Sequence, residues 1–581
     1  MKRTVLRMLG AAVLLLAAVT WWVMPPRPLA SRPVDWTPAQ PVVHGAYHVH
    51  TIRSDGSGTW QEVAEAAART GLRFVIVTDH GDGTEQREPP RYHAGVLVID
   101  GVEISTTAGH YVAIPEHADP APYPLAGEPR AVVEDVRRFF GGAGIGIVAH
   151  PGSPRARLAW RDWDLPFDAI EWLNADSEWR DEGLRLGRTL LTYPFRPVET
   201  LAALVSRPAP VLAEWDRLTA TRAVRTLAGH DAHARLALGG ETDPYDGEAH
   251  WRLPPYEVSF GAFSNRVVLA QPWTGDAGVD ARLLLAAIRQ GAVYTTLDGR
   301  ATPGPFEFEA VAGEARAPMG EWLRAPLGAV TLQARAGAPA GTRLALLHAG
   351  TIIAEGQDGA VSAVVRASGA YRVEAYLPDD GRRRVPWLLS NPIYVDVDDR
   401  YVPSGDGGPE AAAAGDGARP FGDDAAALDP SGLAIETSAG SSLELESVRA
   451  ADGTMGVRLH YTLAPGAPAG QYVALRLPAP ANLASAARLG LITSADRPAR
   501  VWLQLRRPGA GDGERWGRST PIEARRHLAW LPLDEFRPLG VVSEAEVPVE
   551  AVRDLLVVVD TVNTAPGTTG SFTIWGVGPG R

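Results

Sequence analysis

The sequence contains no cysteine, and Lys2 is its only lysine. The absence of thiols excludes disulfide bonds and zinc–thiolate sites, so any metal site in this chain has to use His, Asp and Glu side chains. Basic residues are also outnumbered by acidic ones, 56 to 68, which gives a net charge of -12 at pH 7. This balance argues against non-specific binding to nucleic acid or to anionic lipid, both of which require a basic surface. We therefore expect no nucleic-acid partner.

A long uncharged apolar run lies at the N-terminus. Lys2, Arg3 and Arg7 precede the run Met8–Met24, "MLGAAVLLLAAVTWWVM", and "PPRP" follows it. Its length is near the lower limit for a transmembrane helix, and the preceding positive charges predict that the body of the protein lies outside the cytoplasm. A cleaved signal peptide is the alternative, which would make the protein secreted. We expect an inner-membrane anchor, hence a membrane partner, and a periplasmic or extracellular location.

The chain changes its sequence pattern along its length. Apolar runs that end in ionisable residues first alternate with helix-like stretches, as in a parallel sheet or barrel whose site lies at the carboxyl ends of the strands. After about Pro305, short alternating strands with Gly and Pro turns predict β-sandwiches. The predicted parts are a membrane helix (1–24), a Pro-rich tether (25–43), an α/β domain (44–304), an Ig-like β-sandwich (305–398), a flexible linker (399–432) and a second sandwich or jelly roll (433–581).

Histidines gather in one part of the chain. Eleven of the 14 lie between His44 and His250, whereas surface histidines would scatter. Ionisable residues recur where the predicted strands end: His48, His50, Asp55, Asp79, His80, Glu103, His110, His150, Glu171, Asp231 and His233. Alternate residues of a strand point the same way, so the pairs His48/His50 and Asp231/His233 each present two ligands to one face. Imidazole and carboxylate suit Zn, Mn or Fe, and this many ligands favour two or three divalent ions that activate water against a phosphoryl or acyl centre.

Five motifs, in this order, resemble the polymerase-and-histidinol-phosphatase (PHP) metallohydrolases: "HVHTIRSDG", "TDH", "GVE", "AHP" and "DAH". The resemblance covers about Gly45 to Thr296 and implies a distorted (β/α)7 barrel with a trinuclear site and nine ligands. The predicted fold class is therefore α/β, with such a barrel followed by two all-β sandwich domains and preceded by an N-terminal transmembrane helix.

The resemblance also implies a role for each motif residue. The first ion would be held by His48, His50, Glu103 and Asp231. Glu103 would bridge to a second ion, shared with His150, and the third ion would be held by Asp55, His80 and His233. Glu171 is the residue predicted for the ninth ligand. The predicted catalytic residues are His110, His230 and Asn174, with the two histidines positioning substrate.

The details "GVEIST", "GHY" and "PWLLSNPIYV" look more like the carbaryl-hydrolase-like branch of the family, which is implied to hydrolyse esters or carbamates. Two departures concern the surroundings of the ligands: "GHDAH" places His230 where the branch has serine, and "AY" replaces the usual acidic residue before the first motif's histidine. We expect a metal-dependent hydrolase acting on a small ester, carbamate or phosphoester. One alternative is a phosphoesterase acting on a nucleotide or sugar phosphate. The other is a non-catalytic envelope protein that binds glycan through its C-terminal domain, whose strand pattern resembles carbohydrate-binding jelly rolls.

Overall fold

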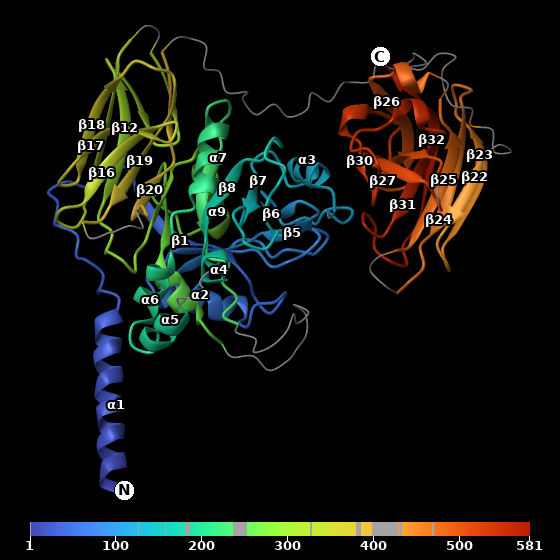
Figure 1. The fold of residues 1–581 in the computed structure, drawn as a ribbon. Helices are drawn as coiled ribbons and strands as arrows, with labels where there is room; N and C mark the ends of the chain where they lie inside the picture. The colour runs from blue at the N-terminus through green and yellow to red at the C-terminus, as the bar shows by residue number, and fades with distance from the viewer. Residues whose placement is uncertain are drawn as a thin grey trace. The chain divides into compact units, whose positions relative to one another are not determined.

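The computed structural model describes residues 2–125, 127–156, 158–180, 186–235, 252–325, 328–378, 385–397, 428, 433–466, 470–480, 482–509 and 511–580. By their contacts these residues form two compact units (Figure 1). Unit 1 comprises Met1–Gly81, Gln86–Asp119 and Val133–Gly408, and unit 2 comprises Asp82–Glu85, Pro120–Val132 and Pro409–Arg581. The predicted linker 399–432 lies outside the described residues, except for residue 428.

Unit 1 is built on two sheets that approach each other where two central strands of the first sheet end. The first is a mixed twelve-stranded sheet with a central order β11-β10-β1-β2-β4-β3. These strands are β1 (Val42–Val49), β2 (Phe74–Val77), β3 (Arg91–His93), β4 (Val96–Asp100), β10 (Ser264–Val268) and β11 (Val293–Thr296). The second is five-stranded, in the order β5 (Val102–Thr106), β6 (Gly109–Ile114), β7 (Ile145–Ala149), β8 (Ala169–Asn174) and β9 (Arg225–Gly229). Isolated parallel bridges, Val49 to Ala232 and His80 to Glu103, join the two sheets where β1 and β2 end.

The described residues also form α-helices, most of which are labelled in Figure 1. They are α1 (Lys2–Val23), α2 (Trp60–Arg69), α3 (Pro129–Phe139), α4 (Ala175–Arg180), α5 (Leu186–Thr192), α6 (Pro197–Leu204), α7 (Ala209–Thr219), α8 (Tyr256–Ala262) and α9 (Ala277–Gln290). Helix α2 begins at a capping box, in which Thr59 accepts from Glu62 N and Glu62 accepts from Thr59 N. Its buried residues, including Val63 and Ala67, pack against β2 and β4.

The predicted (β/α)7 barrel is wrong as a description of this fold. The described residues are mostly β, with 19% helix, and their strands lie in several sheets, many of them antiparallel. The reason is local: β5 and β6 are separated by Thr107 and Ala108 alone, with Gly109 at φ 113°, so they form a hairpin. A crossover helix needs a dozen or more residues, and the strand pair therefore cannot be the parallel βαβ unit that the pattern predicts.

The predicted transmembrane helix is also wrong. In the described part of the chain, no helix is long and apolar enough to cross a membrane. Helix α1 ends at Val23, so its uncharged part from Met8 spans about 24 Å at 1.5 Å per residue, less than the ~30 Å hydrocarbon core. The membrane partner predicted from this segment loses its support, and the extracytoplasmic location stays a prediction that no observation tests.

A β-sandwich completes unit 1. The twelve-stranded sheet continues from β11 through β20 (Leu388–Ser390), and a four-stranded sheet lies in the order β13-β12-β15-β18. The remaining strands are β12 (Phe306–Ala312), β13 (Ala315–Pro318), β14 (Trp322–Arg324), β15 (Val330–Ala336), β16 (Arg343–His348), β17 (Thr351–Gly356), β18 (Ala360–Val365), β19 (Gly369–Tyr376) and β21 (Ile393–Asp396).

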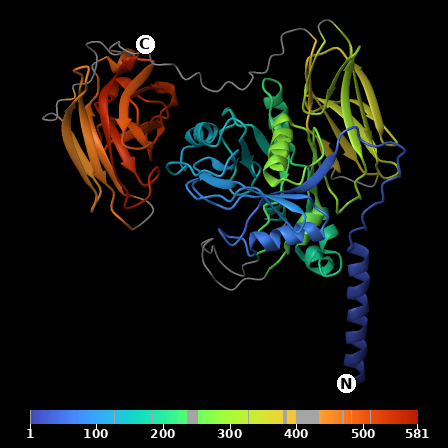
Figure 2. The same cartoon turned by 180° about the vertical axis from the view of Figure 1, so that it is seen from behind.

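Unit 2 has a six-stranded sheet, β22-β25-β31-β27-β28-β30, and a five-stranded sheet, β23-β24-β32-β26-β29 (Figure 2). Their inner faces share one apolar core, to which Leu475, Leu503, Val557 and Trp516 contribute from the first sheet. The strands are β22 (Ala434–Thr437), β23 (Ser442–Arg449), β24 (Met455–Thr462), β25 (Tyr472–Pro478), β26 (Arg488–Ala495), β27 (Ala499–Arg507), β28 (Glu514–Ile522), β29 (His527–Pro532), β30 (Arg537–Pro538), β31 (Asp554–Asp560) and β32 (Thr569–Gly580).

The carboxyl group at the end of β31 gives unit 2 a pH-dependent stability. Burial raises the pKa of Asp560 to about 6, so the folded state binds a proton that the unfolded state releases near pH 4. We expect this group to lower the free energy of unfolding of unit 2 as the pH rises from about 4 to about 6, because the folded state then loses the proton that stabilises it. The residue is partly exposed, so we expect a decrease of only about 1 to 2 kcal/mol. Urea unfolding at pH 4.5 and 7 measures this change, which Asp560→Asn should remove; equal pH dependence in both proteins would contradict it.

Candidate metal centre

The site lies where β1 and β2 of the first sheet meet β5 and β9 of the second. His48 belongs to the end of β1 and His50 follows it, while His80 follows β2 and lies in the bridge to Glu103 of β5. Asp231 and His233 follow β9, and His150 follows β7. The structure thus brings together residues from five separate stretches of the chain.

Glu103 is the centre of this arrangement, and its two carboxylate oxygens face different histidines. Oε2 lies 3.1 Å from His48 Nε2 and 3.2 Å from His50 Nε2. Oε1 lies 2.9 Å from His150 Nε2 and 2.8 Å from His110 Nδ1. A carboxylate placed in this way can bridge two metal ions, one on each oxygen.

Asp231 completes the first set of donors, because its Oδ1 lies 3.2 Å from His50 Nε2 and 3.5 Å from His48 Nε2. We call His48, His50, Glu103 and Asp231 the first group; each offers a ligand atom, and these atoms all lie within 4.8 Å of one another. The second group is His80, Glu103 and His110. His150 is not one of its members, although His150 Nε2 contacts the same Glu103 oxygen as His110 does.

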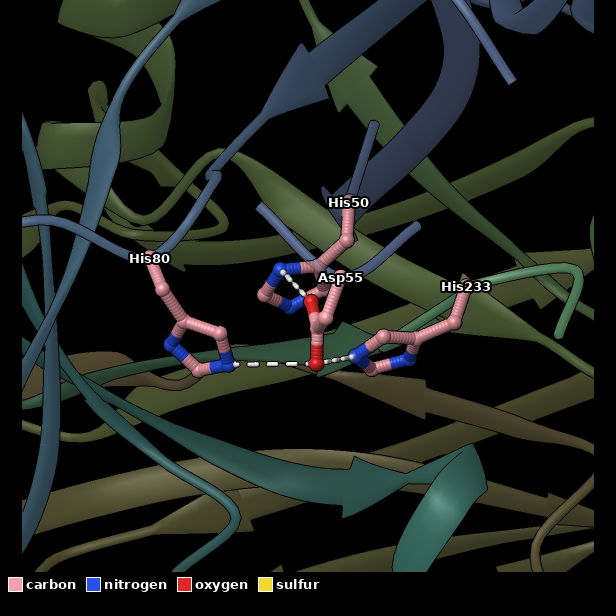
Figure 3. Close-up of side chains that lie close together, drawn as sticks. All are labelled: His50, Asp55, His80 and His233. Atoms are coloured by element: carbon pink, nitrogen blue, oxygen red, sulfur yellow. Dashed lines mark ion pairs between the residues drawn. The ribbon is translucent and has the colours of Figure 1, made fainter. Parts of the chain in front are cut away.

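Asp55 lies at the centre of a third group, shown in Figure 3. Its Oδ2 lies 3.1 Å from His233 Nε2 and 3.6 Å from His80 Nε2, and its Oδ1 lies 3.4 Å from His50 Nδ1. The third group is therefore His50, Asp55, His80 and His233. His80 and His233 are each 19% exposed, whereas His48 and His50 are fully buried, so solvent reaches the centre from the side of the third group.

Three imidazoles are held in orientation by a hydrogen-bond acceptor that faces Nδ1, the ring nitrogen pointing away from the carboxylates of the metal-binding groups. His48 Nδ1 lies 2.5 Å from Glu171 Oε1, His150 Nδ1 lies 3.1 Å from Leu158 O, and His233 Nδ1 lies 2.8 Å from Asp231 O. Each Nδ1 has to carry the proton that it donates, so a neutral ring turns the Nε2 lone pair toward a carboxylate. That juxtaposition is stable only if a proton or a metal ion lies between the two atoms.

The ionisation of these groups follows from their mutual attraction. Burial lowers the pKa of His48, but the carboxylates of Glu171, Asp231 and Glu103 outweigh it and raise that pKa well above its ordinary value. Burial raises the pKa of Glu103, but the surrounding histidines outweigh it and hold it well below its ordinary value. Without metal, His48 and Glu103 therefore form an imidazolium–carboxylate pair, and a divalent ion that binds to them has to displace a proton.

Backbone conformation at the centre is unusual. His48, His150 and Asp231 have positive φ angles of 64°, 29° and 47°, in the left-handed region that residues with side chains rarely adopt. At His48 this conformation accompanies a register shift between β1 and β2. Strain of this kind persists where the surrounding structure over-determines it, and it is concentrated at functional sites.

The loop that carries Asp55 is organised by Asp79. The Asp79 carboxylate accepts from Thr51 N at 2.6 Å, Thr51 Oγ1 at 2.8 Å and Ser54 Oγ at 2.8 Å. Gly56 allows the tight return of the chain, because a Cβ there would lie 2.3 Å from His50 O. Thr51 and Ser54 are not among the predicted site residues, and in the sequence only a polar run between two motif residues marks them.

Two predicted residues orient ligands and are not among the metal-binding groups. Glu171 lies on β8 with Oε1 against His48, while its Oε2 accepts from His150 N at 2.7 Å and from Asn174 Nδ2 at 2.8 Å. Both oxygens of Glu171 are thus engaged with residues beside or among the candidate ligands, and its role as the ninth ligand stays a prediction. Asn174, predicted to be catalytic, contacts Glu171 and caps the Ser177 N–H.

The two remaining catalytic candidates lie differently. His110 belongs to the second group, since its Nδ1 contacts Glu103. Its side chain is 13% exposed, so it is placed to bind either a metal ion or the substrate. His230 does not reach the cluster. Its ring nitrogens lie 3.2 Å from Tyr47 O and 3.0 Å from Phe263 O, and it stacks on the Phe263 ring. Burial lowers the pKa of His230 to about 4, so it is a neutral core residue at pH 7.

The donor set fits divalent metal ions. His50 Nε2 and His80 Nδ1 are buried and have no hydrogen-bond partner of good geometry, although Glu103 Oε2 lies 3.2 and 3.3 Å away. Imidazole and carboxylate ligands in three overlapping groups suit Zn, Mn or Fe. The chain therefore carries candidate metal-binding groups, and they include every predicted ligand except Glu171 and His150, of which His150 contacts Glu103.

Comparison with known proteins adds little to this geometry. No protein-family model and no curated protein sequence matches the chain. A solved two-domain protein from Bacteroides vulgatus that contains a predicted PHP-like metal-dependent phosphoesterase has 15% identity and a TM-score of 0.25, over 63% of this chain and 99% of that one.

Two solved carbohydrate-binding modules of Clostridium thermocellum are similar to about a quarter of the chain. The family 11 module in complex with a β-1,3-1,4-mixed-linked tetrasaccharide has 14% identity and a TM-score of 0.22, over 25% of this chain and 86% of that one. A family 30 module of a cellulosomal cellulase has 8% identity and a TM-score of 0.20, over 27% of this chain and 93% of that one. Scores this low do not establish a shared fold, and none of these comparisons tests the carbaryl-hydrolase-like branch.

Because Glu171 orients His48, its replacement should weaken metal binding without removing a ligand. We expect Glu171→Gln to lower the metal affinity of the first group by about ten- to a hundred-fold, the usual effect of losing a carboxylate behind a ligating histidine. Competition with a chelator measures the affinity, and Glu214→Gln, which changes a glutamate on α7, is the control. An affinity equal to that of the control would contradict the orienting role.

Proposed function

We propose that the chain is a metal-dependent hydrolase of the PHP type, acting on a small ester, carbamate or phosphoester. One observation carries the proposal: the imidazoles of His48, His150 and His233, with Nδ1 fixed as a donor, turn Nε2 toward the carboxylates of Glu103, Asp231 and Asp55. Such a set of lone pairs and negative charges is complementary to divalent cations. The order of the five motifs along the chain supports the same family.

Divalent ions bound there would supply Lewis acidity and lower the pKa of water, the contributions that metal ions make to ester and phosphoester hydrolysis. The chain's own residues hold and orient the ligands: Glu171 orients His48, the Leu158 carbonyl orients His150, and Asp79 fixes the loop before Asp55. His80, His110 and His233 are the partly exposed members, so we place the substrate on their side of the centre. The carbaryl-hydrolase-like branch, with carboxyl or carbamate esters as substrates, is the finer part of this proposal.

The glycan-binding alternative has weaker support within the described residues. Trp530 and Trp575 of unit 2 are partly exposed, as a sugar-stacking residue has to be. However, Arg488 lies over the Trp530 ring at 4.4 Å and Arg526 over the Trp575 ring at 5.1 Å, which occupies one face of each. Glycan binding by unit 2 stays a prediction, and it does not explain the metal-binding groups of unit 1.

The test is metal analysis of the full chain together with hydrolysis of p-nitrophenyl phosphate, bis-p-nitrophenyl phosphate and p-nitrophenyl acetate. Wild type is compared with His48→Ala/Asp231→Ala and with the control Glu257→Gln, which alters a surface residue of α8. We expect two or three bound ions and turnover of at least one substrate, both lost in the double variant and kept in the control. The substrate that is hydrolysed names the reaction class. No stoichiometric metal and no turnover in the wild type would reject the hydrolase.

A further inference from the structure

We propose that unit 1 binds a small polyanion, with phosphate or carboxylate groups, in a second cavity lined by Arg225, Arg282 and Arg289. The cavity has a volume of about 440 Å³. This lies within the range of small-molecule sites, and it admits a ligand of nucleotide or tricarboxylate size.

One face of α9 forms most of the lining. Arg282, Leu285, Ala286 and Arg289 line the cavity, and their spacing of three, four and seven residues places them on one side of the helix. Arg225, the first residue of β9, lies across from them. The arginines thus come from two separate elements and surround an apolar patch made by Leu285 and Ala286.

These three arginines have no carboxylate partner. Arg225 Nη1 donates to Ala223 O at 3.2 Å, and Arg289 Nη1 donates to Gly142 O. Among the described residues, none of the three guanidinium groups forms an ion pair with an Asp or Glu side chain.

Arg225 and Arg289 are partly buried and Arg282 is exposed. Two arginines of similar or lower exposure elsewhere in the chain pair with carboxylates instead. Arg207 lies 2.6 Å from Glu374, and Arg506 lies 3.0 Å from both Glu436 and Asp554. In a chain with net charge -12, three guanidinium groups that line one cavity and form no ion pair with the described residues leave room for a negatively charged ligand.

Glu116 also lines the cavity, and its Oε2 accepts from Ala143 N at 3.2 Å. The lining therefore has three positive charges and one negative charge. Guanidinium groups bind phosphate and carboxylate oxygens with paired N–H donors, and several of them around a cavity favour an anion with more than one charge.

This cavity is separate from the candidate metal centre. Arg225 begins β9 and Asp231 follows its other end, so the two are about 20 Å apart along the strand at 3.3 Å per residue. A ligand in the cavity does not reach the metal-binding groups. The proposal therefore does not depend on the hydrolase activity.

The test is calorimetric titration of the full chain with inorganic pyrophosphate, citrate and sulfate. We expect at least one of these probes to bind the wild type and to bind Arg282→Gln/Arg289→Gln at least about ten-fold more weakly, since each loses a charge-assisted hydrogen-bond donor. The control Arg217→Gln/Arg316→Gln removes the same charge from exposed positions and should bind like the wild type. Binding of pyrophosphate alone identifies a phosphate ligand, and equal binding of citrate identifies polyanions in general.

A second variant keeps the test decisive if the arginine variant folds poorly. Ala286→Glu places a negative charge at an exposed position of α9 inside the cavity and should abolish binding while circular dichroism stays unchanged. The proposal is overturned if none of the probes binds the wild type. It is also overturned if the cavity variants bind as tightly as the wild type, because the anion then lies elsewhere, for example at the metal centre.

Discussion

Replacing Glu103 by glutamine is expected to abolish stoichiometric metal binding in the first and second groups and to lower hydrolytic activity by about a thousand-fold or more. Both carboxylate oxygens face imidazole nitrogens, Oε2 toward His48 and His50 and Oε1 toward His110 and His150. An amide offers one oxygen and one NH₂ group, so it cannot ligate on both sides. Loss of the Lewis acid removes several kcal/mol of transition-state stabilisation, and each 1.36 kcal/mol is a factor of ten.

The measurement is metal content per chain, together with kcat/KM for the p-nitrophenyl substrate that the wild type hydrolyses. Glu257→Gln is the matched control, because it makes the same chemical change in a surface residue that pairs with Arg69. Circular dichroism checks that the fold is kept, as the two side chains have nearly the same size. Full metal content and activity in Glu103→Gln would show that this carboxylate is not a bridging ligand.

The candidate ligands could be predicted from the sequence because the residue type determines whether a side chain can bind a metal ion. A chain without thiols has to use His, Asp and Glu, and the motifs place these residues where strands end. Alternation along a strand predicts that His48 and His50 share a face. Both side chains do contact Glu103. However, His48 has a left-handed backbone conformation at a register shift, and the alternation of side chains along a strand does not predict either feature.

The roles of neighbouring residues could not be predicted in the same way. Glu171 has the residue type of a ligand, yet both of its oxygens are taken by His48, His150 and Asn174. The acceptor that orients His150 is a backbone carbonyl, that of Leu158, and any residue type supplies a carbonyl. Which carboxylate contacts the ion and which lies behind a ligand depends on tertiary geometry and not on residue type.

The sheet topology was missed for a similar reason. Apolar runs that end in polar residues look alike whether the next strand is parallel or antiparallel. The distinction depends on the connection, and between β5 and β6 that connection is too short for a helix. At the N-terminus, the composition of the apolar run is typical of a membrane segment, but the length of α1 beyond Arg7 is not sufficient.

Asp79→Asn is expected to lower the free energy of unfolding of unit 1 by about 2 to 3 kcal/mol and to weaken metal binding in the third group by about ten- to a hundred-fold. Asp79 is 8% exposed and accepts from Thr51 N, Thr51 Oγ1, Ser54 Oγ and Arg53 Nε. Every partner is a donor, so an amide NH₂ group finds no acceptor there unless the Thr51 or Ser54 hydroxyl turns. The carboxylate has no equivalent replacement among the uncharged side chains of its size.

Urea unfolding gives the stability, and chelator competition gives the metal affinity. Asp276→Asn is the matched control, because Asp276 caps α9 by accepting from Val279 N and asparagine caps a helix equally well. The two readouts separate two roles of Asp79. A variant that loses stability but binds all of its metal with full affinity would show that Asp79 fixes only the end of β2. A parallel loss of both would show that the loop from Thr51 to Asp55 owes its ligand geometry to this carboxylate, since Ser54 directly precedes Asp55.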